Sequence, residues 1–328
     1  MRKAIALYSG GLDSMLTLAW AKQVGLAVQP VTFTAPFIKK KENKQKQSYE
    51  YCNKKFEVNL ITKDLGSKVL NMLIKPEFGY GKNLNPCIDC RILMLREAKK
   101  VMSAYKADFI ITGEILGQRP MSQYRESLKL IDQKSNLVRM VLRPLSAKLF
   151  PPTLPEEKGW IKRKDLLSCN GRTRRPQLEL AKKWSLEGFE SPAGGCLLTE
   201  RNYACKLKDL KATKLLTLDN MFLIQYGRYF SLDKRCKVVV ARNEEECEVL
   251  ENYKLKNKVM LKPIGISGPL AVILGEGQEK HCKIAASLVA YYSKRKIKIN
   301  ILLTYGKKQL EFKASAISEK RLRDSLIP

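Results

Sequence analysis

The sequence predicts an α/β fold, a doubly wound parallel sheet covered by helices, followed by a smaller C-terminal α+β domain. A short apolar run near the start of the chain ends in two glycines and leads into a helical pattern. Further short apolar runs alternate with helical segments as far as Leu145, which is typical of a parallel sheet. The chain has 328 residues, more than a single core usually contains, so we expect more than one domain.

The apolar run at 4–8 is expected to be the first strand, and the turn after it is the most informative stretch of the chain. This turn consists of Ser9, Gly10, Gly11, Leu12, Asp13 and Ser14. Glycine accepts a positive φ and lets the backbone approach a ligand closely. The first N–H groups of the following helix lack intrahelical acceptors, so an anion can bind there. The hydroxyl groups of Ser9 and Ser14 add donors, and the Asp13 carboxylate can hold Mg²⁺ or fix the loop. Two adjacent glycines alone would indicate only a structural turn, and the Gly-Lys-Ser/Thr sequence of a Walker loop is absent.

The other elements of the N-terminal part are expected in alternating order. We expect strands at 28–33, 57–60, 109–112 and 140–145, and helices at 67–73 and 91–105. The basic stretch 39–55 is expected to be a helix or a segment beside an RNA backbone, with a solvated surface as an equal alternative. Because ligands of such sheets bind at the carboxyl ends of the strands, the site is expected where these strands end.

The formal net charge is +29, with 61 lysine and arginine residues against 32 acidic ones. So large an excess indicates a polyanionic partner, because neutralising phosphates releases counterions. A lysine-rich, solvated surface is the alternative explanation. No apolar run reaches the ~20 residues that span a membrane, and the chain starts with a strand instead of a signal peptide. We therefore expect a cytoplasmic protein with a nucleic-acid partner and no membrane contact, and a homodimer is left open.

Nine cysteines without an export signal indicate a reducing compartment, in which thiols serve metals or chemistry. Cys87 and Cys90 stand just before the expected 91–105 helix, where the helix start and nearby arginines favour the thiolate. Such a pair is a redox dithiol, half of a zinc knuckle or part of an iron–sulfur site. The single histidine, His281, is expected to be incidental, which excludes hydrolytic triads and most zinc enzymes.

Cys196 is the candidate for a third ligand, because the preceding loop, Ser191-Pro192-Ala193-Gly194-Gly195, can present a side chain into a cleft. Three thiolates would hold a 4Fe–4S cluster and leave one iron open for sulfide or substrate. The alternative is that Cys196 is buried in a turn and that Cys87 and Cys90 are ordinary reduced thiols. Cys169 is the best of the others as an alternative ligand or sulfur relay.

Two stretches of the chain carry a family resemblance. Ser9 to Ser14 resembles the pyrophosphate loop of the PP-loop ATP pyrophosphatases, which split ATP into AMP and pyrophosphate. Gly113-Glu114-Ile115-Leu116-Gly117-Gln118, followed by Ser122-Gln123, resembles the Gly-Glu-x-Leu-Gly-Gln-x-x-Ser-Gln segment of tRNA 4-thiouridine synthetases, with one residue more before Ser122. Asn85-Pro86-Cys87-Ile88-Asp89-Cys90 looks more like tRNA 2-thiouridylases and cluster-dependent tRNA thiolases. The resemblance covers about the first 200 residues, the usual size of one domain.

The resemblance implies an ATP-dependent tRNA sulfurtransferase. ATP with Mg²⁺ would bind the loop from Ser9 to Ser14, and the nucleotide would lie beside Gly113, Glu114 and Gln118. The residues implied in the chemistry are Asp13, Cys87, Cys90 and Cys196. ATP would adenylate a uridine carbonyl oxygen, and sulfur from sulfide or a cysteine desulfurase persulfide would replace it with loss of AMP. The favoured product is 4-thiouridine at tRNA position 8, and 2-thiolation is the alternative. A lysidine-type PP-loop ligase and a non-catalytic RNA-binding protein are rivals from other classes.

Three regions are expected along the chain. They are a PP-loop domain at 1–185, a cysteine loop and connecting region at 186–233, and a small α+β domain at 234–328. Beyond Cys196 we expect helices at 201–214, 243–253 and 278–292, and strands at 223–230, 237–240, 259–261, 271–274, 297–303 and 310–313. The C-terminal domain resembles the NFACT-R type attached to some thiolases, which implies contact with RNA. The basic run 294–298 is expected to hold tRNA phosphates, with a solvated edge strand as the alternative.

Overall fold

The computed structural model describes residues 2–38, 42–189, 196–253, 258–294 and 298–328. The chain divides into two compact units, 1–195 and 196–328. The boundary between them falls inside the region 186–233, which the sequence predicts as a connection. Each unit has its own sheet and its own apolar core, so each is described by itself.

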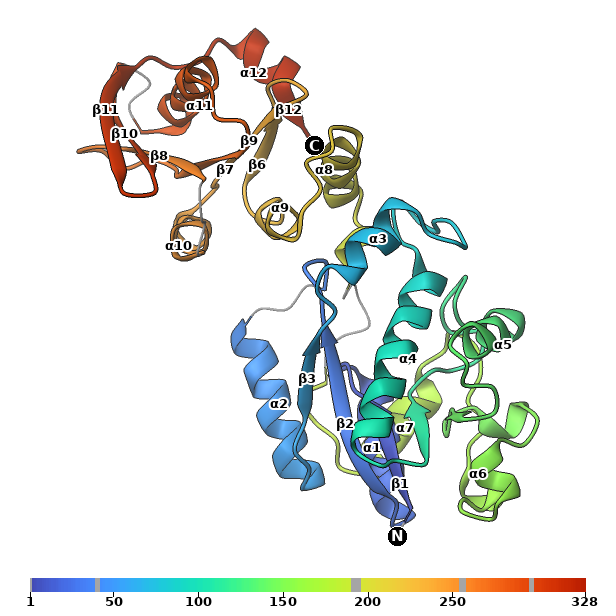
Figure 1. Ribbon diagram of the computed structural model, residues 1–328. Coiled ribbons are helices and arrows are strands. Elements are labelled where there is room, and N and C mark those ends of the chain that lie inside the picture. Colours follow the sequence, from blue (N-terminus) through green and yellow to red (C-terminus); the bar gives the residue numbers. More distant parts are fainter. Residues whose placement is uncertain (1, 39–41, 190–195, 254–257, 295–297) are drawn as a thin grey trace. The chain divides into compact units, whose positions relative to one another are not determined.

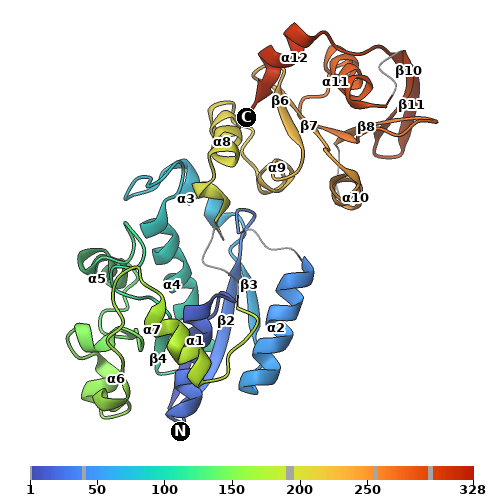
Figure 2. The same cartoon turned by 180° about the vertical axis from the view of Figure 1, so that it is seen from behind.

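The N-terminal unit is a five-stranded parallel sheet in the order β3-β2-β1-β4-β5, which confirms the predicted fold class. Helices α1 and α7 lie on one face of this sheet and α4 lies on the other (Figure 1 and Figure 2). The strands are β1 (Lys3–Leu7), β2 (Ala27–Thr34), β3 (Ile61–Asp64), β4 (Phe109–Thr112) and β5 (Val141–Leu142). The helices are α1 (Leu12–Gln23), α2 (Glu42–Phe56), α3 (Lys68–Ile74), α4 (Cys87–Ala104), α5 (Arg125–Lys134), α6 (Leu154–Glu157) and α7 (Arg175–Lys183).

The central strand of this sheet is β1, which pairs with β2 on one side and β4 on the other. In this register Leu7 lies opposite Val31 and Thr112, so the turns after β1 and β4 begin side by side. The order of the strands reverses between β1 and β4, and that switch point is where open α/β sheets bind ligands. The strand ends at which the sequence predicts the ligand are therefore neighbours in the structure.

Helix α1 is buried over most of its length, which explains its composition. Every residue from Met15 to Ala21 is buried, because the helix packs between the sheet, α2 and α7. A helix that is apolar on all sides belongs in a core. The α1 side chains and the central strands form one apolar cluster that also holds Phe109 and Leu142.

Some predicted boundaries in this unit are wrong. The strand expected at 57–60 lies instead at Ile61–Asp64, because the preceding helix continues to Phe56 and Asn53 then accepts hydrogen bonds from the N–H groups of Val58 and Leu60. The strand expected at 140–145 is reduced to Val141–Leu142, since the chain turns at Arg143, whose carbonyl accepts from the N–H of Ser146. The helix expected from Arg91 already begins at Cys87.

The C-terminal unit contains a seven-stranded sheet in the order β11-β10-β8-β9-β7-β6-β12, and its neighbouring strands are antiparallel. Helix α11 packs on this sheet through Ala285, Ala286 and Val289. The strands are β6 (Arg228–Ser231), β7 (Cys236–Val240), β8 (Val259–Pro263), β9 (Ala271–Gly275), β10 (Ile299–Tyr305), β11 (Lys308–Ala314) and β12 (Leu326–Ile327). The helices are α8 (Arg201–Ala212), α9 (Leu218–Leu223), α10 (Glu244–Asn252), α11 (Glu279–Tyr292) and α12 (Glu319–Ser325).

The strand expected at 223–230 is the main error in this unit. Residues Leu218–Leu223 form α9, whose first turn is capped by the Thr217 hydroxyl, and the strand begins only at Arg228. Gly227 separates the two elements with a φ of +82°, and a side chain there would lie 2.4 Å from the carbonyl oxygen of Val240. Glycine is therefore required at this corner.

A buried lysine ties β6 and β7 to α8. The Lys237 side chain is 1% exposed, and its ammonium group lies 3.0 Å from the Asp209 carboxylate and donates to the Ser231 hydroxyl at 2.6 Å. Tyr229 donates to the same carboxylate at 2.6 Å. A buried charge is tolerable only when it is paired and hydrogen-bonded, and this network meets that condition.

None of the helices in the described part of the chain combines the length and the apolar character needed to cross a membrane.

Candidate functional site

The loop after β1 has the geometry of an anion site. Gly10 has a φ of +79°, and Gly11 stands before the first turn of α1 in an extended conformation. The Ser14 hydroxyl donates to the carbonyl of Gly11 at 2.7 Å and accepts from the N–H of Ser9 at 3.2 Å. The Ser48 hydroxyl, from α2, lies 2.8 Å from the position that a Gly10 side chain would take. The loop is therefore closed on itself, and any other residue at Gly10 would be strained by the positive φ and would displace the Ser48 hydroxyl.

The segment after β4 lies directly against this loop. A side chain on Gly113 would lie 2.5 Å from the carbonyl oxygen of Asp13 and 2.9 Å from the nitrogen of Ser14. Only glycine permits so close an approach of two backbones. The structure thus brings the two stretches that carry the resemblance into contact at the carboxyl edge of the sheet.

Asp13 supplies the carboxyl group of the loop. Burial raises its pKa, and a hydrogen bond from Gln118 together with the charges of Arg174 and Arg119 opposes this rise. Its Oδ1 atom is buried and has no hydrogen-bond partner among the described residues. Because an unsatisfied buried oxygen is costly, this atom fits a Mg²⁺ ion or a polar ligand group as its partner.

Glu114 belongs to a buried ionic network. Its carboxylate, which is 4% exposed, accepts from Arg143 at 3.0 Å and from the Thr112 hydroxyl at 3.1 Å, and Arg91 lies 3.5 Å away. Arg143 also forms a bidentate pair with Asp132 on α5. Burial alone would raise the pKa of Glu114, but the two guanidinium groups outweigh it and hold that pKa below its usual range. We infer that Glu114 holds the segment after β4 in place.

Sequence reasoning missed a further segment at this edge of the sheet. After β5 the chain runs in extended form beside the earlier turns, with the N–H of Cys169 donating to Leu145 at 2.7 Å and that of Gly171 donating to Leu116 at 2.8 Å. Leu116 and Asn170 form a parallel bridge, which adds this segment next to the Gly113–Gln118 stretch. The signal that could have revealed it is Arg172-Thr173-Arg174-Arg175 followed by a proline at a helix start.

Helix α7, which follows this segment, brings polar groups to the loop. Arg174 precedes its first turn and acts electrostatically on Asp13. Gln177 in that first turn is 1% exposed, and neither polar atom of its side chain has a partner in the described residues. The buried polar atoms of this kind found in the described ranges belong to Asp13, Gln123 and Gln177, all in the N-terminal unit. Such atoms indicate a site that a polar ligand or water completes.

Cys87 and Cys90 lie in the first turn of α4, both partly exposed. The Asn85 side chain donates to the Cys87 sulfur at 2.9 Å. Cys196 is the first residue of the C-terminal unit, and the loop 191–195 before it lies outside the described residues. In the ranges that the structure describes, no three side chains of the kinds that bind metals are gathered into a site. The N-terminal unit thus supplies two of the three thiolates that the sequence suggested.

Cys169 is poorly suited to act as a sulfur relay. Burial raises the pKa of its thiol, and the nearby Asp13 carboxylate raises it further. A thiol becomes a nucleophile only as the thiolate, so both effects make Cys169 less reactive. Its side chain lines a cavity of about 590 Å³ between the added segment and α7.

Two family models match separate parts of the chain. Residues 1–148 match the family described as Thiamine biosynthesis protein (ThiI). This match agrees with the resemblance that the sequence carries in the same residues. Residues 227–325 match the family described as NFACT protein RNA binding domain, which confirms the predicted resemblance of the C-terminal part. The ThiI match contains the loop after β1, the Gly113–Gln118 segment and both cysteines of α4.

Curated relatives match a stretch of similar length. A probable tRNA sulfurtransferase of Thermococcus kodakarensis is 29% identical over 148 residues, 44% of this chain and 36% of that protein. One of Mycoplasma genitalium is 31% identical over 147 residues, with the same shares. One of Bacillus velezensis is 32% identical over 144 residues, 44% of this chain and 34% of that protein. The chain spans about a third of the length of the curated relatives it matches.

Solved structures with some likeness include a 4-thiouridine synthetase–RNA complex with bound ATP, at 22% identity and a TM-score of 0.37, covering 56% of this chain and 52% of that one. Another is the U34-tRNA thiolase NcsA from Methanococcus maripaludis with its [4Fe-4S] cluster. It has 13% identity and a TM-score of 0.31, and covers 68% of this chain and 69% of that one.

The Glu114 network predicts a pH-dependent stability. Because the folded pKa of Glu114 lies below its ordinary value of 4.5, the stabilisation is complete above that pH and is lost as the pH falls through the folded pKa. Glu114→Gln removes the charge that faces Arg143 and Arg91, although Arg143 keeps its pair with Asp132, and should cost about 1–3 kcal/mol at pH 7. The difference from the unsubstituted protein should shrink at acid pH. All three tryptophans precede residue 196, so urea unfolding followed by tryptophan fluorescence reports on the N-terminal unit. A difference that is constant with pH would contradict the role given to Glu114.

Substitution of two adjacent arginines tests whether the start of α7 belongs to the site. Arg174→Ala should weaken the binding of inorganic pyrophosphate to the loop, measured by calorimetry, by about 10-fold, because it removes a cation beside Asp13. Arg175 is the matched control, since its side chain is 86% exposed and pairs with Glu179 on the helix surface. Arg175→Ala should stay within about twofold of the unsubstituted protein. Equal effects of the two substitutions would remove Arg174 from the site.

Proposed function

We propose that the chain is an ATP-dependent tRNA sulfurtransferase that converts a uridine to a thiouridine, most simply 4-thiouridine at tRNA position 8. The observation that carries this proposal is the contact between Gly113 and the Asp13 backbone, which joins the phosphate loop to the segment beside it. Support comes from the ThiI-family match and from the curated relatives, each described as a probable tRNA sulfurtransferase.

The loop supplies the ATP half of the reaction. The triphosphate would lie on the N–H groups of Gly10, Gly11 and the first turn of α1, with Asp13 holding Mg²⁺ and Arg174 balancing negative charge. The uridine carbonyl oxygen attacks the α-phosphorus, and pyrophosphate leaves. The oxygen then departs from the ring carbon as AMP, which makes it a far better leaving group than before.

Delivery of sulfur is the second half of the reaction, and two routes are open for it. Cys87, Cys90 and Cys196 would hold a 4Fe–4S cluster, which when bound presents sulfide. In the alternative route Cys196 carries a persulfide. The outer sulfur adds to the activated carbon and AMP leaves, then Cys87 or Cys90 attacks Cys196 to form a disulfide and release the thiouridine. That route needs a desulfurase as sulfur donor and an external reductant for each turnover.

A tRNA partner agrees with the charge and the C-terminal match. The net charge of +29 favours a polyanion, and residues 227–325 match an RNA binding domain. A cytoplasmic location, where tRNA is modified, belongs to the same proposal. Of the basic run 294–298, residues 295–297 lie outside the described residues, as do 39–41 of the basic stretch 39–55.

The rival functions differ in what they ask of the cysteines. A lysidine-type ligase would use the same loop and a basic surface but needs no reactive thiols. A non-catalytic RNA-binding protein needs neither the thiols nor a complete loop. The partly exposed thiols at the start of α4, together with a complete loop in the same unit, favour the sulfurtransferase over both.

Nucleoside mass spectrometry of tRNA from a strain lacking the gene tests the activity. We expect 4-thiouridine to disappear and to return with the intact gene but not with Asp13→Ala, since a lost phosphate-site group costs about 10²–10³ in rate. Asp324→Ala, an exposed carboxylate on α12, is the control and should restore the base fully. Loss of 2-thiouridine with 4-thiouridine intact would transfer the proposal to 2-thiolation. Unchanged thiolation with Asp13→Ala would refute the ATP site.

Cysteine substitutions separate the sulfurtransferase from its rivals and the two sulfur routes from each other. Cys87→Ala and Cys90→Ala should abolish thiolation, whereas Cys205→Ala on α8 should leave it intact. Anaerobic purification with an iron assay then decides the route. Iron that is lost in the Cys87, Cys90 and Cys196 variants supports the cluster. Iron-free protein that is active with persulfide donors contradicts it, and full activity of Cys87→Ala and Cys90→Ala would favour a ligase.

A further inference from the structure

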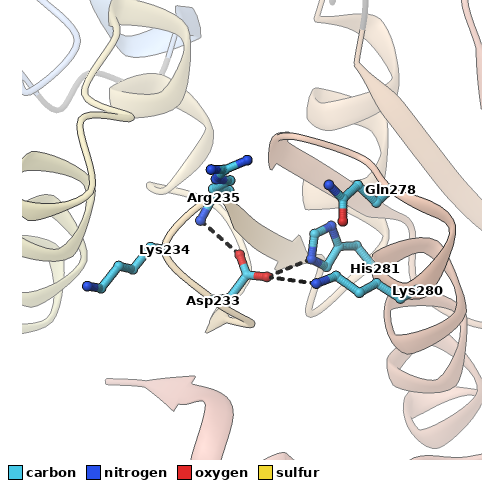
Figure 3. A pocket seen from close by; sticks show the side chains of 6 residues that line it. All are labelled: Asp233, Lys234, Arg235, Gln278, Lys280 and His281. Carbon is cyan, nitrogen blue, oxygen red and sulfur yellow. Dashed lines mark hydrogen bonds and ion pairs between the residues drawn. The ribbon is translucent and has the colours of Figure 1, made fainter.

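We propose that a cavity at the start of α11 in the C-terminal unit binds a phosphate group of the RNA. This inference rests on the proposed function, since it places one contact of the proposed tRNA partner. The cavity has a volume of about 340 Å³ and is lined by Asp233, Lys234, Arg235, Gln278, Lys280 and His281 (Figure 3). All of these residues lie within the stretch that matches the RNA binding domain.

Asp233 builds the wall of this cavity. Its Oδ1 accepts from the N–H of Arg235 at 2.8 Å and from the N–H of Cys236 at 2.9 Å, which fixes the turn before β7. Its Oδ2 lies 2.7 Å from Nε2 of His281 and 3.7 Å from the ammonium of Lys280 (Figure 3). Donors of the protein therefore surround Asp233, the one carboxylate that lines the cavity. Its negative charge is balanced within the protein and repels an incoming anion less.

His281 joins the turn to the helix. Its ring is 2% exposed, and Nδ1 lies 3.0 Å from the carbonyl oxygen of Glu276 while Nε2 faces Asp233. Both ring nitrogens thus face oxygen atoms of the protein, one on each side of the ring. The histidine that the sequence marked as incidental is a structural link that holds two sides of the cavity together.

The cations of the cavity are available to an anion. Lys234 extends away from Asp233 and has no ion-pair partner among the described residues (Figure 3). Arg235 and Lys280 are 73% and 66% exposed, and their acidic neighbours are distant, at 3.6 Å for Glu276 and 3.7 Å for Asp233. Such long, exposed pairs contribute little and yield readily to a stronger anion.

The helix adds to this charge. Helix α11 has 14 residues, and its first N–H groups have no intrahelical acceptor. Gln278 at the cap makes no side-chain hydrogen bond to them, and its amide lines the cavity. One acidic group, Glu279, opens the helix, but it pairs with Lys283 and does not line the cavity. Three cations, an amide and a helix start together suit a phosphate, which accepts several donors at once.

The test compares two triple variants of the full chain. The first carries Lys234→Ala, Arg235→Ala and Lys280→Ala. The control carries Lys308→Ala, Lys320→Ala and Arg321→Ala, which removes the same charge from exposed positions of the same domain outside the cavity. Binding to a tRNA transcript is measured over a range of salt concentrations. We expect the first variant to bind about tenfold more weakly, with a salt slope smaller by about one, than the control.

Two further measurements distinguish the possible sources of the phosphate group. An equal loss with dephosphorylated transcript places an internal phosphodiester in the cavity, and a loss confined to 5′-phosphorylated transcript places the terminal phosphate there. If millimolar inorganic phosphate stabilises the unsubstituted protein but not the first variant, while both bind tRNA equally, the ligand is free phosphate and the RNA assignment is wrong. Equal tRNA binding by the two triple variants refutes the phosphate site in the cavity but leaves the proposed tRNA partner in place. An unsubstituted protein that binds no tRNA refutes the proposed partner.

Discussion

The N-terminal unit depends on one close approach, the backbone of Gly113 against the backbone of Asp13 and Ser14. It follows from the sheet, because β1 and β4 are neighbours in register and the chain leaves both strands at the same edge. A side chain at Gly113 would force the two turns apart, and the phosphate loop would lose the surface it rests on. The order of the strands and the absence of one Cβ therefore decide whether the two turns can meet at all.

A buried network of ion pairs around Arg143 holds the segment after β4 in place. Arg143 leaves the end of β5 and reaches both Glu114 after β4 and Asp132 on α5, so a single guanidinium connects three segments. Buried ion pairs add little net stability, but each partner left alone is costly, which makes the arrangement specific. The C-terminal unit uses the same principle with Lys237 and Asp209, although it shares neither topology nor sequence pattern with the first unit.

Much of the fold could be predicted from the sequence, because strand and helix periodicities and the glycine turn are local signals. The parallel sheet, its active edge and the C-terminal α+β domain follow from them. The segment from Cys169 to Gly171 was missed, since its hydrogen bonds go to residues distant in sequence and it has no strand pattern of its own. The strand at Ile61 was misplaced because Asn53 extends the end of a helix by a side-chain bond that periodicity does not reveal. The role of Glu114 was likewise invisible, for it depends on arginines from two other elements.

The start of α4 at Cys87 has a consequence for how the two halves of the proposed reaction communicate. One helical turn carries both thiols and, directly after Cys90, the Arg91 that reaches Glu114. A helical turn is stiff, because its N–H and carbonyl groups are bonded to one another, as Cys90 is to Pro86. The residues that carry the thiols are therefore joined, through Arg91, to the segment that packs against the turn after β1.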